Sequence, residues 1–203
     1  MRYYTDRNTL FLRGPFRAAS TGTHGGIRSV GTLLTHRAES ADAEPGRELE
    51  IAAAGAGIGG DWFGVLTTVP PGQACVLQYD FITVFITAGI RREGPGGTGS
   101  VAVTATSSEG MSDGALLEAI MVAAEAKAEA LLAEGLPLSG TPADSVIAAC
   151  EGHEQHHFAG RATEAGKRIR EAVLHGIPAA LTRHDTGVNA THPAFFIFSR
   201  MGG

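Results

Sequence analysis

The sequence contains few cysteines and no surplus of basic residues. Its two cysteines, Cys75 and Cys150, lie far apart in apolar surroundings, which predicts buried thiols in a reducing compartment rather than a disulfide framework. The 16 Lys and Arg residues stand against 21 Asp and Glu residues, for a formal net charge of −5. Such a chain gains little from releasing the counterions of a polyphosphate backbone, so we expect no nucleic-acid partner.

Long apolar runs are also missing. No segment approaches the roughly 20 apolar residues that cross a bilayer, and the residues from Met1 to Asp6 lack the apolar stretch of a signal peptide. These absences predict a cytoplasmic protein without a membrane partner. Hydrophobic residues make up 43% of the 203 residues, and no long polar linker divides them, so we expect a single domain over residues 1–203.

Short runs rich in Val, Ile, Phe and Thr predict strands that come in blocks. We expect strands at 9–13 and 16–20, interrupted by Gly14 and Pro15, two or three adjacent strands within 63–90, and further strands at 27–35, 101–106, 145–150 and 195–198. The alanine-rich segment 44–54 predicts a weak helix. Blocks of strands favour an α+β fold with a mainly antiparallel or mixed sheet, covered by two long helices.

The first long helix is predicted over 113–134. Ser112 or Asp113 supplies its cap, and Gly135 ends it. Its predicted inward face has helical spacing and consists of Leu117, Ile120, Met121, Ala124, Ala128 and Leu131.

The second long helix is predicted to begin after a cap at Thr163. Ile169, Val173 and Ile177 recur at helical spacing and are expected to face inward. Gly176 and Pro178 are expected to stop this helix, because glycine and proline commonly mark helix ends.

Two short motifs match known patterns but lack the structural context that those patterns need. Gly55–Gly60 fits the dinucleotide pattern GxGxxG, yet a predicted helix precedes it and a strand-rich stretch follows it. His153–His157 fits HExxH, in which two histidines one helical turn apart bind zinc. Gly152 and Gly160 bracket this segment, so a surface loop is the preferred interpretation, and a zinc site at His153 and His157 remains the alternative.

The usual nucleophile signatures GxSxG, SxxK and CxxC are missing. Four polar stretches remain: Gly25–Gly26, Glu125–Lys127, Ser139–Ser145 and Phe158–Gly166. Residues two apart on a helix do not face each other, so Glu125 and Lys127 cannot form a local ion pair. Glu164 falls in the first turn of its predicted helix, where the helix dipole stabilises an ionised carboxylate.

Taken in order, these stretches resemble the adenosylcobinamide amidohydrolase family, CbiZ. The resemblance includes Ser112–Ala119, Glu125–Ala128, Ser139–Thr141 with Asp144 and Val146, and Ala159–Gly160 with Thr163, Glu164 and Gly166. It extends more weakly through Gly64–Thr67 and Thr87–Gly89 back to Gly25–Gly26, and so covers most of the chain.

The resemblance implies hydrolysis of the amide that joins the aminopropanol arm to the corrin ring, giving adenosylcobyric acid and 1-amino-2-propanol. It implies a corrinoid substrate and no cofactor, and a homo-oligomer is compatible with it. For acid–base work it suggests Glu125 or Glu164, with Asp144 as orienter or alternative base and Lys127 as electrostatic helper. The Gly25 and Gly26 amides are expected to act as hydrogen-bond donors, and Thr141 is an alternative nucleophile. The expected substrate-binding residues are His24, Gly25, Gly26, Thr67, Thr141 and Thr163.

Three polar groups depart from the family pattern. His24 stands where the pattern has Asn, Ala124 stands where it has Thr, and Gly140–Asp144 reads Gly-Thr-Pro-Ala-Asp in place of Gly-Thr-x-Thr-Asp. A non-catalytic paralogue that binds a corrinoid or another small ligand is therefore a second hypothesis. The acidic residues Glu125, Asp144 and Glu164 are expected to converge on one cleft beside the glycine pair.

Overall fold

Residues 1–38, 44–91, 98–188 and 190–198 are described by a computed structural model, in which nine strands form one mixed sheet. The strand order is β11-β5-β6-β7-β9-β2-β3-β4, and β1 pairs with β2. The strands are β1 Arg2–Asp6, β2 Thr9–Ser20, β3 Gly26–Arg37, β4 Trp62–Thr67, β5 Cys75–Tyr79, β6 Ile82–Arg91, β7 Thr98–Ser107, β9 Ser145–Cys150 and β11 Ala194–Phe198. The pairs β3–β4, β7–β9 and β11–β5 are parallel and the others are antiparallel, so the predicted α+β fold with a mixed sheet is confirmed.

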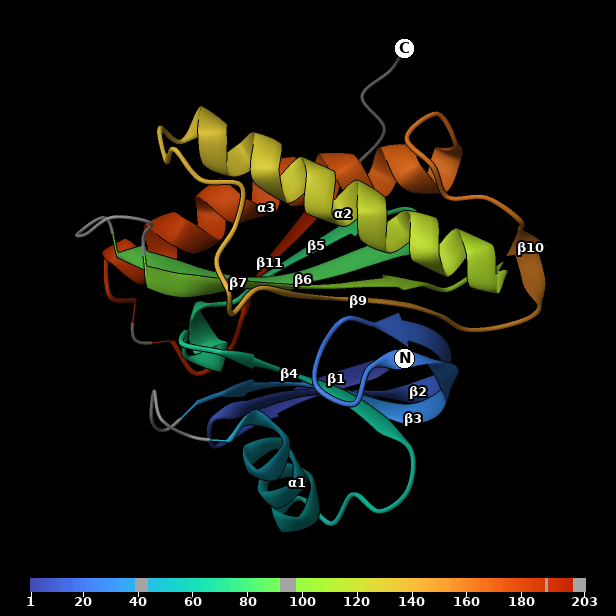
Figure 1. The fold of residues 1–203 in the computed structure, drawn as a ribbon, viewed down its shortest axis with the longest axis horizontal. Helices are drawn as coiled ribbons and strands as arrows, with labels where there is room; N and C mark the ends of the chain where they lie inside the picture. The colour runs from blue at the N-terminus through green and yellow to red at the C-terminus, as the bar shows by residue number, and fades with distance from the viewer. Residues whose placement is uncertain (39–43, 92–97, 189, 199–203) are drawn as a thin grey trace.

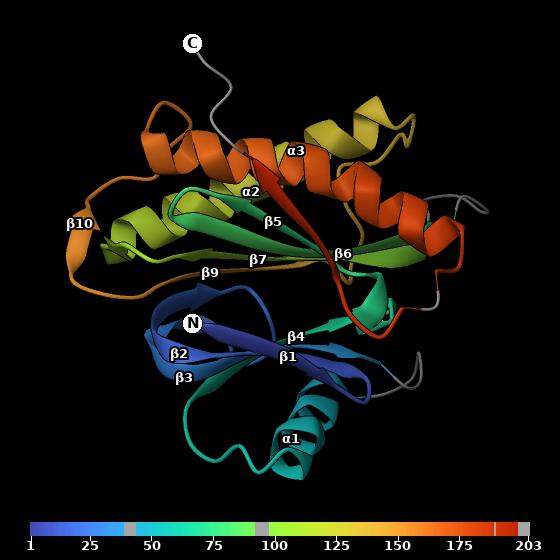
Figure 2. The ribbon, with the colours of Figure 1, turned by 180° about the vertical axis from the view of Figure 1, so that it is seen from behind.

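The sheet curls so that its two halves face each other (Figures 1 and 2). One half contains β5, β6, β7, β9 and β11 and is covered by the helices α2 (Asp113–Ala133) and α3 (Glu164–Asp185). The other half contains β1 to β4 and carries α1 (Pro45–Gly55) on its outer face. A 3-10 helix, η1 (Pro71–Gln73), links the halves, and a small parallel pair is formed by β8 (Gly110–Met111) and β10 (Glu154–His156).

Three apolar clusters hold these layers together. The largest lies between α2, α3 and their half of the sheet. A second joins the two facing halves, where Leu12 and Phe63 pack in one cluster with Phe85 and Ile147. The third anchors α1 through Leu49. Burial of apolar area in these clusters provides the main driving force for the layered arrangement. No helix of the described residues is long and apolar enough to span a membrane.

The strand β2 connects the two halves. The sequence predicted two strands here, but Gly14 and Pro15 lie within one continuous strand whose pairing with β3 shifts register between Arg13 and Phe16. Such a bulge bends a strand without ending it. The first part of β2 pairs with β1, which the sequence patterns did not predict, and residues 17–20 pair with β9.

Two or three adjacent strands were predicted within 63–90; three are present, but they are not all adjacent. β5 and β6 are neighbours, whereas β4 pairs in parallel with β3 at the far end of the strand order. The parallel pairing requires a crossover between β3 and β4, and α1 lies in that connection. Glu44 caps α1 by accepting hydrogen bonds from the backbone N–H groups of Gly46 and Arg47, and Pro45 is its first residue.

The helix α2 begins after a cap at Ser112 and is followed by Gly135 with φ +73°, as predicted. Its predicted inward face is wrong in part. Leu117 and Met121 are 49% and 61% exposed, and the helix instead packs through small residues, namely Ala115, Ala119, Ala123, Ala126 and Ala130, together with Leu116, Val122 and Leu131. An alanine face lets α2 approach the sheet closely. The prediction relied on the larger side chains, and two of these lie outside the buried stripe.

The helix α3 is capped by Thr163 and buries Ile169, Val173 and Ile177, as predicted. The predicted stop at Gly176 and Pro178 is wrong, because α3 continues to Asp185. Gly176 serves close packing instead, since a Cβ there would lie 2.5 Å from side-chain atoms of Leu77 and Ile86. Tertiary packing on the sheet thus carries the helix through a proline that would disfavour it in isolation.

Candidate active site

A pocket of about 480 Å³ lies between the two halves of the sheet, at one end of their strands. Its lining includes residues 21–23 of the β2–β3 turn, residues 65–68 at and just after the end of β4, Ser100 of β7, and residues 142–145 at the start of β9. The turn is tied to β9 because the Thr21 N–H donates to the Val146 carbonyl at 3.0 Å. Two of the stretches that carry the family resemblance, Gly64–Thr67 and Ser139–Ser145, therefore meet at one cavity, next to the turn that leads to Gly25 and Gly26.

Asp144 is the carboxylate in the described lining of this pocket, and both of its oxygens are occupied. Oδ1 accepts from the Val101 N–H at 2.8 Å and lies 2.7 Å from the Thr141 hydroxyl. Oδ2 accepts from Lys127 Nζ at 2.5 Å and from the Thr141 N–H at 2.9 Å. A carboxylate has about four acceptor positions, so these donors orient Asp144 and leave it poorly placed to take a proton.

Lys127 reaches Asp144 from the buried side of α2. The two side chains are only 11% and 8% exposed, which makes this a buried ion pair with additional hydrogen bonds. Thr141 also lies 2.9 Å from the Gly99 carbonyl, so its single hydroxyl proton is shared between Gly99 and Asp144. Lys127, Asp144 and Thr141 together fix the 139–145 loop against the start of β7.

Four hydroxyl groups are linked to one another around Ser100, the residue before Val101, whose N–H donates to Asp144. Thr67 ends β4, and its Oγ1 lies 3.1 Å from Ser100 Oγ and 3.1 Å from Thr87 Oγ1. Ser100 Oγ lies in turn 3.2 Å from Thr68 Oγ1. Among these four residues, the sequence indicated only Thr67 as a binding residue. The pairing of β6 with β7, and the curl of the sheet that brings β4 against β7, place the others around Ser100, and no local motif marks them.

The β2–β3 turn has a backbone that only certain residues adopt. His24 has φ +56° and Gly26 has φ +117°, and His and Asn are among the non-glycine residues enriched at such angles. A Cβ on Gly25 would lie 2.3 Å from the Ser20 carbonyl oxygen and 2.8 Å from that of Gly22. The histidine in place of the expected asparagine is thus compatible with the conformation of the turn. His24 Nε2 lies 4.0 Å from Glu50 Oε1, beside the pocket lining.

Glu125 and Glu164 do not reach this pocket. Glu125 lies on the exposed side of α2, with an oxygen 3.7 Å from Arg161 Nη1. Glu164 lies in the first turn of α3, and hydrogen bonds from Arg168 and then Lys167 lower the pKa of its carboxyl group. Thr163 caps α3 by accepting the Gly166 N–H at 3.0 Å. The expected convergence of Glu125, Asp144 and Glu164 on one cleft is therefore not found.

The HExxH segment does not form the helix that a zinc hydrolase of this type needs. Residues 154–156 form β10, so His153 and His157 are not held one helical turn apart. His157 Nδ1 lies 2.7 Å from Glu154 Oε1. Within the described part of the chain, no group of three or more His, Cys, Asp or Glu side chains is arranged to hold a metal ion.

The GxGxxG segment likewise lacks the required order of elements. Gly55 ends α1, the chain then turns through Gly57 and Gly60 with φ +68° and +85°, and β4 follows. A dinucleotide loop would instead leave a strand and open a helix.

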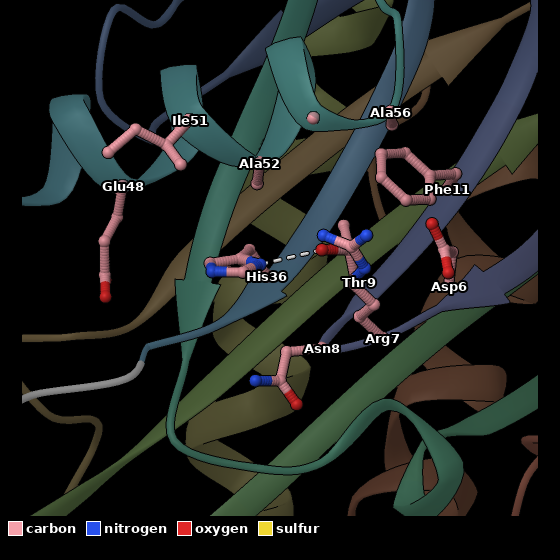
Figure 3. Close-up of a pocket in the computed structure, with 11 residues that line it drawn as sticks. Asp6, Arg7, Asn8, Thr9, Phe11, His36, Glu48, Ile51, Ala52 and Ala56 are labelled. Atoms are coloured by element: carbon pink, nitrogen blue, oxygen red, sulfur yellow. Dashed lines mark hydrogen bonds between the residues drawn. The ribbon is translucent and has the colours of Figure 1, made fainter.

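A second, smaller cavity lies between α1 and the β1–β2 turn (Figure 3). Its volume is about 170 Å³, and its lining includes Arg7, Asn8 and Thr9 from the turn and Ile51 from α1. The Thr9 hydroxyl lies 2.7 Å from His36 Nδ1. None of the site residues expected from the sequence lines this cavity, and its size does not suit a corrinoid.

Comparisons with known proteins show which family the chain is similar to. A sequence model of the family described as adenosylcobinamide amidohydrolase, CbiZ, matches residues 3–188. A protein of that name from Methanosarcina mazei is 34% identical over 195 residues, which cover 89% of this chain and 98% of that protein. Another of that name, from Halobacterium salinarum, is 34% identical over 152 residues, or 66% of this chain and 65% of that protein. The chain therefore belongs to the adenosylcobinamide amidohydrolase family, CbiZ.

Proposed function

We propose that this protein hydrolyses the amide between the aminopropanol arm and the corrin ring of adenosylcobinamide, in the salvage of corrinoids. The observation that carries the proposal is the meeting of distant family stretches at one pocket. Residues 21–23 of the β2–β3 turn, Thr67 at the end of β4 and residues 142–145 line this site, and Lys127 of α2 holds Asp144 in place.

The reaction adds water to the carbonyl carbon and breaks the C–N bond. The acyl part leaves as adenosylcobyric acid, and the nitrogen takes a proton and leaves as 1-amino-2-propanol. Negative charge develops on the carbonyl oxygen during the attack, and preorganised hydrogen-bond donors stabilise it. The hydroxyl group of Thr68, at the wall of the pocket, suits this task. Asp144, held by Lys127, acts as the orienting group between the loop and β7.

The size of the pocket indicates how the substrate would lie. A cavity of about 480 Å³ is within the range for small-molecule sites, but a whole corrinoid with its adenosyl group is larger. We propose that the aminopropanol arm enters the pocket while the corrin ring stays outside it. His24, Gly25 and Gly26 then contact the substrate from the turn beside the entrance.

Turnover tests the proposal directly. Purified protein is incubated with adenosylcobinamide, and mass spectrometry follows the appearance of adenosylcobyric acid and 1-amino-2-propanol. We expect both products in equal amounts. Asp144→Asn should reduce turnover strongly, whereas the matched control Asp113→Asn should not, because Asp113 pairs with Arg17 at an exposed site. A folded protein that releases neither product would contradict the proposed function.

One observation favours the second candidate, a corrinoid-binding protein without turnover. Pro142 and Ala143 line the pocket, and Ala143 occupies the position at which the family pattern has threonine. A missing hydroxyl at the pocket wall would change the contacts with the substrate. This candidate predicts a spectral shift when the corrinoid is titrated into the protein, without release of product.

A further inference from the structure

The hydroxyl groups of Thr87, Thr67, Ser100 and Thr68 form a continuous chain across the two halves of the sheet. Thr87 of β6, Thr67 of β4 and Ser100 of β7 are 2%, 2% and 0% exposed. Thr68, the last member, is exposed and lines the pocket. The successive oxygen–oxygen distances from Thr87 to Thr67, Ser100 and Thr68 are 3.1, 3.1 and 3.2 Å. The chain thus leads from the core to the cavity.

The number of donors around each oxygen sets the direction of this chain. A hydroxyl group has one proton and two acceptor positions. Thr67 Oγ1 accepts from the Val69 N–H at 3.1 Å and from the Thr87 hydroxyl at 3.1 Å. Both of its acceptor positions are therefore filled, and its own proton points to Ser100.

The same count applies to Ser100. Its Oγ accepts from the Thr68 N–H at 2.9 Å and, by the argument above, from the Thr67 hydroxyl. Its proton therefore points to Thr68 Oγ1. The direction runs from Thr87 through Thr67 and Ser100 to Thr68, and the Thr68 hydroxyl keeps its proton for a partner in the pocket.

We propose that this chain makes Thr68 the hydrogen-bond donor to the carbonyl oxygen of the amide that is cleaved. Each hydroxyl that accepts a hydrogen bond becomes a stronger donor itself, because the bonds polarise one another. The Thr68 hydroxyl donates most strongly when negative charge develops on the carbonyl oxygen. The inference rests on the proposed amidohydrolase function and names a residue that the family resemblance did not indicate.

The chain suits hydrogen-bond donation better than nucleophilic attack. Among the described contacts, no histidine nitrogen and no carboxylate oxygen touches any of the four hydroxyl groups, so none of them has a base to remove its proton. Thr68 therefore forms no covalent bond: it donates to the oxygen while water attacks the carbon, and it keeps its proton when the amine leaves.

The Asp144 ion pair positions this chain. Asp144 holds the Val101 N–H, which belongs to the residue directly after Ser100. Thr141 lies within hydrogen-bond distance of the Gly99 carbonyl, on the other side of Ser100. The loop 139–145 thus fixes the backbone on both sides of Ser100, and this gives Asp144 a positioning role that does not require contact with the substrate.

Steady-state kinetics with adenosylcobinamide test the inference on the full chain. Thr68→Val removes the hydroxyl but keeps the shape and the backbone N–H, and we expect kcat to fall about 100-fold or more with little change in KM. Thr68→Ser keeps the hydroxyl and should retain most of the wild-type kcat. Ser100→Ala interrupts the chain but leaves the Thr68 hydroxyl, so its kcat should lie between those of the wild type and Thr68→Val.

The control is Thr106→Val, because Thr106 is also a buried hydroxyl residue of β7 and donates to the Thr83 carbonyl at 2.9 Å. It should lose stability without losing kcat, and thermal unfolding of every variant separates the two effects. A folded Thr68→Val protein with wild-type kcat would overturn the role of Thr68. A wild-type protein without turnover would instead contradict the proposed function and remove the reaction on which the inference depends.

Discussion

The buried ion pair of Lys127 and Asp144 provides a quantitative test of how the loop 139–145 is held. Lys127 Nζ and Asp144 Oδ2 are 2.5 Å apart, and the two side chains are 11% and 8% exposed. Asp144→Asn leaves the Lys127 cation buried without its counter-charge. It also replaces one acceptor oxygen by an NH₂ group, which cannot accept the hydrogen bonds of the surrounding donors. Removing one partner of a buried pair costs about 3–5 kcal/mol.

The expected change in melting temperature follows from the size of the protein. One kcal/mol corresponds to about 2–4 °C for a domain of 150–250 residues, so Asp144→Asn should lower the Tm by roughly 6–20 °C. Lys127→Met leaves Asp144 with its backbone and hydroxyl donors. Its loss should be about 1.5–3 kcal/mol, the contribution of one hydrogen bond to a charged group.

A double-mutant cycle in urea isolates the interaction. The double variant no longer leaves a buried charge unpaired, so its loss should be smaller than the sum of the single losses by about 2 kcal/mol. The control cycle uses Arg17 and Asp113, which also form two short hydrogen bonds, at 2.8 and 2.6 Å, but are 41% and 53% exposed. Its coupling should stay below about 1 kcal/mol and weaken in salt. Losses that simply add at Lys127 and Asp144 would refute the reasoning.

Three further results are expected. Gly25→Ala should lower the free energy of unfolding by about 1–3 kcal/mol, because its Cβ would lie 2.3 Å from the Ser20 carbonyl oxygen. The control is Gly31→Ala, where no atom lies within 4 Å of the added Cβ. Equal urea midpoints for the two variants would contradict the argument. Glu125→Gln and Glu164→Gln should both keep the wild-type kcat, since neither carboxylate reaches the pocket. Loss of turnover in one of these variants would show that the replaced carboxylate takes part in catalysis. Burial raises the pKa of Cys75 to about 11, so this thiol should react with a disulfide reagent at pH 8 only after unfolding, and rapid labelling of the native protein would show that it is accessible.

Much of the secondary structure followed from local patterns, because capping residues and apolar periodicity act over a few neighbouring positions. Ser112 and Thr163 cap the two long helices as expected, and the strand from Ser145 to Cys150 has the predicted bounds. The errors arose where packing overrides propensity. Pro178 lies inside α3, and the helix continues past it because its buried face packs against the sheet.

The site was only partly accessible from the sequence. Asp144, Lys127, Thr141 and Thr67 were chosen through the family resemblance, and the structure brings them to one region. Ser100 was not found, because its importance comes from the neighbours that strand pairing and the curled sheet place around it. Contacts between residues 33 positions apart, such as that of Thr67 with Ser100, produce no local sequence pattern from which they could be predicted.

A structure of the Thr68→Val variant with adenosylcobinamide would test the central claim most directly. This variant should bind the substrate and cleave it slowly, so that the complex can be observed. We predict that the amide of the aminopropanol arm lies in the pocket, with its carbonyl oxygen beside residue 68 and the corrin ring outside. A corrinoid whose aminopropanol arm lay elsewhere, such as the open groove lined by Arg13 and Arg17, would contradict the account.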